Sequence, residues 1–347
     1  MPKDIELLYE GEQIKLSKSV QKKITAWYEA CIDKVLAGQS ITLGKRNIFY
    51  INDFPALNNR INKQLKALYE NVVIEMLTGI DQAWNLSNSK TDKIVNIKLK
   101  GKTPSERRQQ LLFDNNADAL QQFKARKIKG LNLSERVWTQ VKDYRRELES
   151  AIGVGVHEGK SAQAIAASTK KYLQEPDKLF RKVRDAEGNL QLSRQAKAYN
   201  PGQGVYRSSH ANAMRVARTE TNMAYRSADH ARWKQIPFIT GFTVKLSNNH
   251  PTFDICDHLQ GDYPVDFKFA GWHPQCRCYA VSKMMSDAEY DKYEDYILGI
   301  SDDYDLSKVK RVTNVPAAMT KYIEQNKDRI EAWQSKPYWM KDNKGFV

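Results

Sequence analysis

The sequence predicts an α+β protein that is predominantly α-helical, with a small antiparallel β-sheet carrying a cluster of cysteine and histidine residues. Three observations support this. Apolar residues recur three and four positions apart over most of the chain, which is the period of helices buried on one side. After Pro237 the period changes to two, as in a half-buried strand. Between Asp254 and Tyr279 the chain concentrates three of its four cysteines and two of its six histidines.

Two long helices are expected first, over residues 14–37 and 55–84, with Ile14 among the apolar residues of the buried faces. The polar residues 87–89 indicate a break. The sequence that follows, 93–102, alternates between polar and apolar residues and therefore predicts a short strand or an extended arm.

Further helices are expected at 104–127 and 133–157, the second beginning with Ser134 as its N-cap. A compact amphipathic helix should follow Ser161 and end before Pro176. The segment 181–204 is rich in glycine, asparagine and arginine, and we expect an exposed basic excursion with a hairpin turn at Glu187-Gly188-Asn189.

A long helix is predicted from Ser208 to Trp233. Small residues recur along one side of it, so another backbone can approach closely, and a neighbouring face is polar: Arg215, Arg218, Asn222, Arg226 and Asp229. Glu220 borders the packed side. An unpaired buried carboxylate is costly, so we expect Glu220 to pair with an arginine; a catalytic role is the alternative interpretation.

Two strands should form the sheet, at 238–246 and within the sequence CRCYAVS that begins at Cys276. Helices near 286–297 and 315–334 follow. Four segments are expected: a helical N-terminal unit, a basic extended or helical connector, a domain with the cysteine cluster and a helical C-terminal tail, at residues 1–89, 90–130, 131–282 and 283–347.

The cysteine cluster has the donor types of a structural zinc site. Cys256, Cys276 and Cys278 follow the spacing C-x19-C-x-C, and His273 precedes the second thiol by three residues. Thiolate sulfur and imidazole nitrogen are the ligands that tetrahedral zinc prefers. Strong zinc signatures have a CxxC pair at each end, and Phe253 stands where the additional cysteine would be. Reduced thiols packed among aromatic residues, or a disulfide, are the alternatives.

The net charge of +14 arises in the middle of the chain, where residues 90–234 contain 30 basic and 15 acidic side chains. A basic segment between near-neutral ends is typical of proteins that contact phosphate or another polyanion, although exposed helix faces also carry such charge. The candidate nucleic-acid-binding residues are Lys124, Arg126, Lys127, Lys129, Arg181, Lys182 and Arg184.

No secretory leader begins the sequence, and no run of 18 or more apolar residues occurs in it. We therefore expect a soluble protein without a membrane partner. Four cysteines in 347 residues do not make a secreted disulfide framework. These features indicate maturation in a reducing cytoplasm.

The order of motifs resembles a known family. A Gly-Lys-Ser helix start at 159–161 is followed by RVARTETNMAYRSADHARW (215–233), a strand, CDHLQG (256–261) and GWHPQCRC (271–278). This order resembles the phage Mu F-like minor head proteins, also called phage head morphogenesis proteins, over about residues 130–282. The family's motif residues would correspond to Arg218, Thr219, Glu220, Trp233, Cys256, Gly261, His273, Pro274, Cys276, Arg277 and Cys278.

The resemblance implies a minor capsid protein of the virion, assembled in the host cytoplasm and placed inside the head or at the portal vertex. Its partners would be the portal protein, the major capsid or scaffolding protein, and packaged DNA bound without sequence preference. It would act in head assembly, packaging or ejection. We expect a structural role and no enzymatic activity.

A metal-dependent nuclease or other hydrolase is the main alternative, with His250, His258 and His273 near a metal and Glu220 as a base. A site closed by four protein ligands argues against this interpretation, because no position remains for a reactive water. The sequence contains no P-loop, GxSxG or HExxH motif. A cellular DNA-binding protein would need a recognition module, and none is evident.

Overall fold

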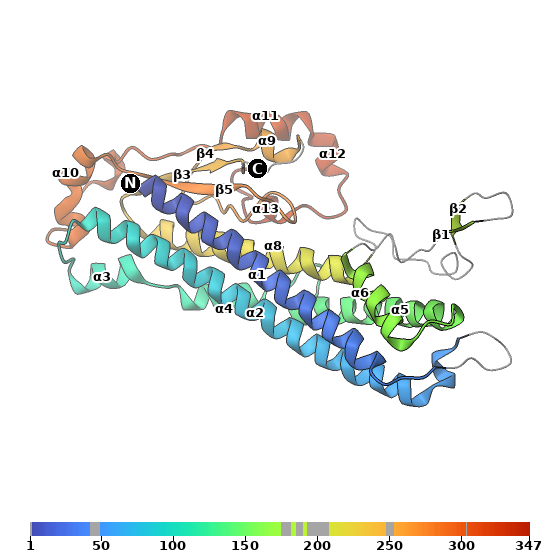
Figure 1. Ribbon diagram of the computed structural model, residues 1–347. Coiled ribbons are helices and arrows are strands. Elements are labelled where there is room, and N and C mark those ends of the chain that lie inside the picture. The colour runs from blue at the N-terminus through green and yellow to red at the C-terminus, as the bar shows by residue number, and fades with distance from the viewer. Residues whose placement is uncertain are drawn as a thin grey trace. The chain divides into compact units, whose positions relative to one another are not determined.

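The computed structural model describes residues 2–41, 49–174, 182–184, 190–192, 208–247, 253–302 and 304–347. The prediction of a predominantly helical α+β chain with a small antiparallel sheet is confirmed (Figure 1). The main helices are α1 (Pro2–Leu36), α2 (Pro55–Leu99), α3 (Glu106–Phe113), α4 (Ala117–Ala125), α5 (Leu133–His157), α6 (Ala162–Gln174), α8 (Ser209–Gln235), α10 (Asp287–Leu298) and α11 (Ala317–Gln325).

Shorter elements complete the described chain. The strands are β1 (Lys182–Arg184), β2 (Leu190–Leu192), β3 (Ile239–Lys245), β4 (Gly261–Tyr263) and β5 (Tyr279–Met284). The short helices are η1 (Ile51–Asp53), α9 (Ile255–His258), η3 (Leu306–Lys308), α12 (Lys327–Glu331) and α13 (Tyr338–Lys341).

The chain forms two compact units, each built from separate stretches of sequence. The first unit contains Met1–Ser17, Thr78–Lys124 and Arg218–Val347, and the second contains Lys18–Leu77 and Ala125–Ala217. Helices α1, α2 and α8 therefore contribute residues to both units. The four consecutive segments expected from the sequence differ from this division, in which the expected connector 90–130 is shared between the units.

The second unit is helical and has an aromatic centre. The ring of Tyr28 on α1 lies 4.7 Å from that of Tyr144 on α5 and 5.1 Å from that of His210 on α8. Helices α5 and α6 approach closely, since a Cβ atom added to Gly155 would lie 2.4 Å from Ile165. Strands β1 and β2 pair antiparallel on either side of the predicted hairpin turn, whose three residues lie outside the described part of the chain.

The first unit contains the three-stranded antiparallel sheet, in the order β4-β3-β5. The alternating residues of β3 direct Phe242 and Val244 into the core, where both are buried. The ring of Phe242 stacks on that of Tyr263 in β4, with centroids 5.7 Å apart. The strand predicted to begin at Cys276 begins only at Tyr279, so both cysteines of CRCYAVS precede the strand.

The N-terminal part of α1 has an inverted polarity. Its buried side chains between residues 4 and 17 are Glu6, Gln13 and Ser17, whereas the apolar Leu8 is 55% exposed and Ile14 is 40% exposed. The prediction that Ile14 lies on a buried face is therefore wrong. The polar contacts of this helix provide the physical reason, since both carboxylate oxygens of Glu6 accept hydrogen bonds from Ser282 on the edge strand β5.

The break predicted at 87–89 and the extended segment at 93–102 are also wrong, because α2 continues to Leu99. Four polar residues of this part of the helix are buried: Ser87, Asn88, Lys90 and Thr91. Ser87 donates a hydrogen bond to Asp229 on α8, Thr91 donates to the Ser87 carbonyl, and Lys90 forms an ion pair of 2.6 Å with Asp229. A polar sequence that resembles a loop thus forms the buried contact between α2 and α8.

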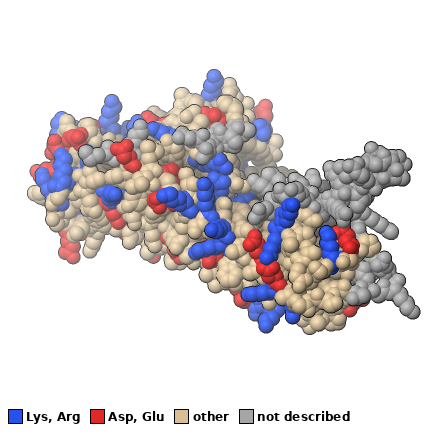
Figure 2. All heavy atoms as spheres, viewed as in Figure 1, with Lys and Arg blue, Asp and Glu red and all other residues tan. Residues whose placement is uncertain are grey.

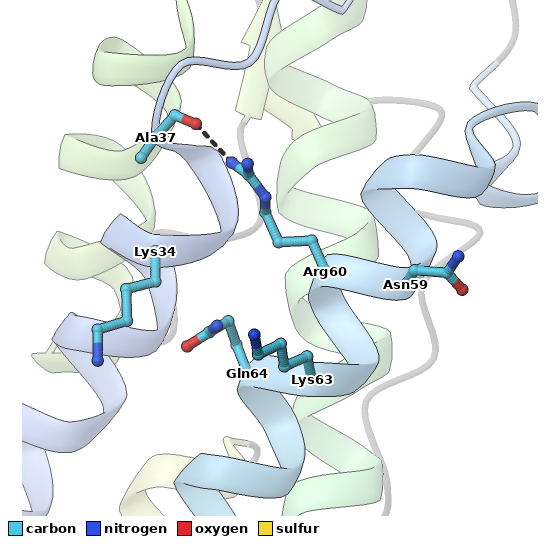
Figure 3. Close-up of a pocket in the computed structure, with 6 residues that line it drawn as sticks. All are labelled: Lys34, Ala37, Asn59, Arg60, Lys63 and Gln64. Carbon is cyan, nitrogen blue, oxygen red and sulfur yellow. Dashed lines mark hydrogen bonds between the residues drawn. The ribbon is translucent and has the colours of Figure 1, made fainter.

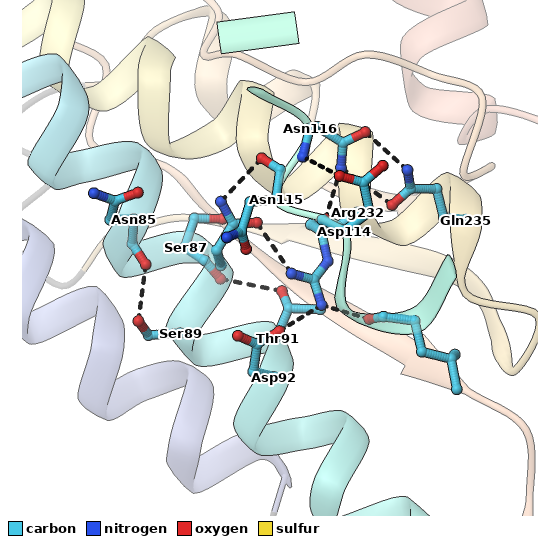
Figure 4. A network of polar contacts seen from close by, with 12 residues as sticks. Asn85, Ser87, Ser89, Thr91, Asp92, Asp114, Asn115, Asn116, Arg232 and Gln235 are labelled. Carbon is cyan, nitrogen blue, oxygen red and sulfur yellow. Dashed lines mark hydrogen bonds and ion pairs between the residues drawn. The ribbon is translucent and has the colours of Figure 1, made fainter. Parts of the chain in front are cut away.

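A second buried network surrounds Arg232, which is fully buried on α8 (Figure 4). Its guanidinium donates to Asp92 at 2.6 Å, to Asn88 at 3.2 Å and to the Leu112 carbonyl at 2.6 Å. The nearby side chains of Asn116 and Gln235 hydrogen-bond to each other. These contacts connect α2, the α3–α4 connection and α8.

Several helix boundaries differ from the prediction. The expected helix 104–127 is interrupted between α3 and α4, where Asn116 has a φ of +53°. Helix α5 spans the predicted residues, but its N-cap is Asn132 rather than Ser134; Asn132 and Glu135 form a capping box. The helix expected at 315–334 is divided into α11 and α12. Ser161 caps α6 as predicted.

Candidate metal centre

A capped helical turn positions Cys256. Asp254 is the N-cap of α9, and its carboxylate accepts a hydrogen bond from the Cys256 backbone N–H at 2.7 Å. In turn, the Asp257 carboxylate accepts a hydrogen bond from the Asp254 backbone N–H at 2.7 Å. This reciprocal capping box fixes the first turn of the short helix and places the Cys256 thiol in the interior, where the residue is 1% exposed.

A tight turn places His273 and Cys276 together. The Cys276 N–H donates to the His273 carbonyl at 3.0 Å, Pro274 is the second residue of the turn, and Gln275 has a φ of +63°. Proline at the second position and a positive φ at the third are typical of a type II turn. The sequence HPQC is thus a turn that brings an imidazole and a thiol to one side.

The three thiols converge at this turn. The sulfur atoms of Cys256, Cys276 and Cys278 all lie within 4.8 Å of one another, and those of Cys256 and Cys276 are 3.7 Å apart. All three residues are buried and none forms a disulfide. The cluster can therefore hold a metal ion.

His273 presents a ring nitrogen to the same cluster. Its Nε2 atom lies 3.1 Å from the Cys256 sulfur and 3.3 Å from Oδ2 of Asp254, while Nδ1 lies 2.8 Å from the Pro274 carbonyl. A proton on Nδ1 would be donated to that carbonyl, which leaves the Nε2 lone pair facing the thiol.

The described ligands form two overlapping groups of three. The first comprises the three thiols, and the second comprises Asp254, Cys256 and His273. The predicted set of three thiols with His273 is therefore assembled around Cys256, but it does not form a single compact group of four. Asp254 is a potential ligand in addition to the predicted set.

Hydrogen bonds between the thiols change their acidity. The contact with Cys256 holds the pKa of Cys276 well below its usual value, and the same contact raises the pKa of Cys256. Two S–H groups can thus stabilise one thiolate. A bound cation would replace these protons, so metal binding and proton release are coupled at this site.

Helix α8 contacts the cysteine turn directly. The Gln275 backbone N–H donates to Oγ1 of Thr219 at 3.2 Å, and Nδ2 of Asn222 donates to the Cys276 carbonyl at 3.4 Å. A Cβ atom added to Gly271 would lie 3.2 Å from Cβ of Cys276, and Gly271 has a φ of +103°. The RTE and GWHPQCRC motifs therefore form one contiguous structure.

The other motif residues have structural positions. Trp233 is buried, with its ring 5.4 Å from that of Phe242 on β3. Gly261 has a φ of +138°, and an added Cβ atom would lie 2.8 Å from Pro316. Pro274 and Arg277 are exposed, and Arg218 is half-buried. Glu220 is buried as expected, and its pairing with an arginine stays a prediction.

The aromatic residues of the alternative interpretation belong to the same hydrophobic core cluster as the three thiols. Tyr263, Phe267, Phe269 and Trp272 are all buried, and the rings of Phe269 and Trp272 lie 5.0 Å apart. Trp272 also contacts Trp339 on α13 at 5.7 Å. The C-terminal segment thereby helps to enclose the cluster.

The histidines of the nuclease alternative do not all join this site. The ring of His258 lies 5.0 Å from Phe253 and 5.4 Å from Tyr322, and His258 belongs to neither group of potential ligands. His250 lies outside the described residues. His273 is the histidine that faces the described thiols.

The candidate nucleic-acid-binding residues are in different environments. Lys124 forms an ion pair with Asp81, whereas Lys127 and Lys129 are exposed beside a tight turn from Ile128 to Leu131. Arg126 is half-buried. Arg181 lies outside the described residues, and Lys182 and Arg184 belong to β1, where only the backbone is described. In the face shown in Figure 2, basic and acidic side chains are interspersed.

A buried ionic network was missed by the sequence interpretation. Arg226 and Asp229, expected on a polar outer face of α8, are both 1% exposed. Arg226 donates to Glu10 of α1 at 2.6 and 2.5 Å, and Asp229 pairs with Lys90 of α2. The polar residues of α1 and α2 at matching helical spacing are the signal that could have indicated these partners.

Comparisons with models of protein families, with curated proteins and with solved structures find no match to this chain. In the described part of the chain, no helix is sufficiently long and apolar to cross a lipid bilayer.

Proposed function

We propose that this chain is a phage minor capsid protein of the head morphogenesis type, with a structural role in the virion. The observation that carries this proposal is the contact between its two most specific motifs. Thr219 in the RTE motif accepts from Gln275 in the HPQCRC turn, although 56 residues separate them. Because the two motifs stabilise one hydrogen-bonded structure, we expect that structure to require both of them.

We further propose that the cluster binds a structural zinc ion through Cys256, Cys276, Cys278 and His273. In a tetrahedral site with Zn–S bonds of about 2.3 Å, two sulfur atoms are separated by about 3.8 Å. The Cys256–Cys276 distance of 3.7 Å is close to this value. His273 is half-buried, and a small movement of its ring toward the other thiols would complete the four ligands. Zinc would cross-link α9 to the turn that contacts α8.

The proposed location is the inside of the phage head or the portal vertex. The partners would be the portal protein, the major capsid or scaffolding protein, and packaged DNA bound without sequence preference. The exposed lysines Lys127 and Lys129 support the DNA contact, because they project from a tight turn. Lysine contacts to phosphate would make this binding depend strongly on salt.

A metal-dependent nuclease is less compatible with the site. Each of the three cysteines is at most 5% exposed, so a nucleic-acid strand could not reach an ion held among their sulfur atoms. Glu220, the expected base, is 1% exposed. DNA cleavage with Mg²⁺ or Zn²⁺ that is lost on Glu220→Gln would favour the enzyme over the structural protein.

The proposed function is tested by co-purification with the portal protein encoded in the same genome. The intact chain is expected to bind the portal protein and to sediment with assembled heads. Cys31→Ser serves as a matched control for Cys276→Ser, because both residues are buried free cysteines and Cys31 lies in the other unit. Head association should survive the first change and decrease with the second. An intact chain that binds neither portal protein nor heads would refute the proposal.

A further inference from the structure

The second unit contains an open pocket lined mainly by basic and amide residues, whose aliphatic stems form most of the wall surface. The pocket has a volume of about 500 Å³ and lies between the end of α1 and the first turns of α2 (Figure 3). Its lining residues are Lys34, Ala37, Asn59, Arg60, Lys63 and Gln64. Lys34 comes from α1, and the other four basic or amide residues labelled in the figure belong to α2.

Three cations share this pocket without a carboxylate in its lining. Two other basic residues of the same unit form ion pairs: Lys23 with Glu75 at 3.3 Å, and Lys170 with Asp33 at 2.6 Å. Within the described residues, Lys34, Arg60 and Lys63 have no such ion pair. Three cations that line one pocket would attract an anion.

Arg60 is oriented before any ligand binds. One guanidinium nitrogen donates to the Ala37 carbonyl at the end of α1, at 2.5 Å. This contact fixes the planar group at the pocket wall and leaves other N–H donors for a ligand. A planar guanidinium with free donors suits bidentate contact with a phosphate, and the Gln64 amide adds a neutral donor (Figure 3).

We propose that this pocket binds a phosphate group, with the phosphodiester backbone of DNA as its source. Three cations favour a ligand with several negative oxygens over a single carboxylate. A free oligophosphate offers the same chemistry and is separated from DNA by the experiment below. This site extends the DNA contact of the proposed function to a part of the chain outside the basic segment 90–234. It does not depend on association with phage heads.

The test uses the full chain and two double variants of equal charge. Lys34→Gln/Lys63→Gln removes two pocket cations and retains Arg60, which also contacts Ala37. Lys22→Gln/Lys66→Gln removes two exposed lysines from the same helices outside the pocket. Pyrophosphate binding is measured by calorimetry, and binding of a short random-sequence duplex is measured by fluorescence anisotropy over a range of salt concentrations.

The pocket variant is expected to bind pyrophosphate at least about tenfold more weakly than the control variant. For DNA, the slope of log K against log salt should decrease by about 2, as expected for two lost phosphate contacts. Weaker pyrophosphate binding with unchanged DNA binding would support the phosphate site and assign it to a free oligophosphate. Absence of pyrophosphate binding, or equal effects of the two double variants, would overturn the proposal. Failed co-purification with phage heads would leave this result unaffected.

Discussion

The Nε2 atom of His273 lies 3.1 Å from the sulfur of Cys256 and 3.3 Å from a carboxylate oxygen of Asp254. Either His273 or Asp254 could therefore complete a site with the thiols. Imidazole is the better ligand for zinc beside thiolates, and Asp254 is already occupied as the N-cap of α9.

We predict that His273→Ala weakens zinc affinity by more than about 100-fold, whereas Asp254→Asn weakens it by less than about tenfold. Asparagine is also a good N-cap, so the second change preserves the helix start. Competition with a chromogenic chelator measures both affinities. A larger loss in Asp254→Asn than in His273→Ala would assign the carboxylate as the ligand.

Arg232→Ala should destabilise the protein by about 2–4 kcal/mol, because the change leaves the buried Asn88 side chain and Leu112 carbonyl without their donor. Arg232 is fully buried, and its guanidinium makes two hydrogen bonds of 2.6 Å, to Asp92 and to the Leu112 carbonyl. Lys234→Ala is the control, since its ion pair with Asp266 is largely exposed. The control should change the free energy of unfolding by less than about 1 kcal/mol. Urea denaturation compares them, and equal effects would show that the Arg232 network adds no stability.

Stability in the second unit should depend on the protonation of Glu147. Burial raises the pKa of this carboxyl to about 7 from its usual 4.5, although it accepts two hydrogen bonds from Ser209. Between pH 4.5 and 7 the folded protein therefore binds more protons than the unfolded chain, so the free energy of unfolding falls as pH rises. This contribution is complete below pH 4.5 and is lost above pH 7.

Glu147→Gln should remove about 3 kcal/mol of this pH dependence. Thermal or urea unfolding across pH 4.5 to 8 measures the difference between the variant and the parent protein. A difference that stays constant over this range would show that Glu147 titrates at the same pH in the folded and unfolded chains.

Gly261→Ala should cost more stability than Gly101→Ala. Both glycines have a positive φ, +138° and +82°, so alanine is strained at either position. At Gly261 the new methyl group would also lie 2.8 Å from Pro316, whereas at Gly101 no atom lies within 4 Å. We expect a difference of about 1–3 kcal/mol between the two variants. Similar melting temperatures would indicate that the segment with Pro316 moves away freely.

Helix periodicity was sufficient to predict most elements, and local composition failed where polar residues are buried. The bounds of α5 match the predicted 133–157 because its apolar residues repeat regularly and a capping residue precedes them. The sequence around Ser87 and Lys90 resembles a loop, and only the partner Asp229 on a distant helix explains its burial. Ile14 shows the converse, since it is exposed although it is apolar.

The candidate site was partly predictable for a similar reason. The concentration of cysteines and the HPQC turn are local signals, so the sequence alone predicts that Cys256, Cys276 and Cys278 belong to one site. The second group of potential ligands, with Asp254, depends on the distance between α9 and the turn. That distance follows from tertiary packing, which spacing along the chain does not encode.

The most direct test of the structural metal centre is zinc content measured together with thermal unfolding. The protein is purified from zinc-supplemented cells, and its zinc is quantified by mass spectrometry before and after chelation. We predict about one zinc ion per chain, its loss in Cys278→Ser, and a melting temperature that falls by several degrees when the ion is removed. A zinc-free protein whose melting temperature does not respond to zinc or to a chelator would contradict the account.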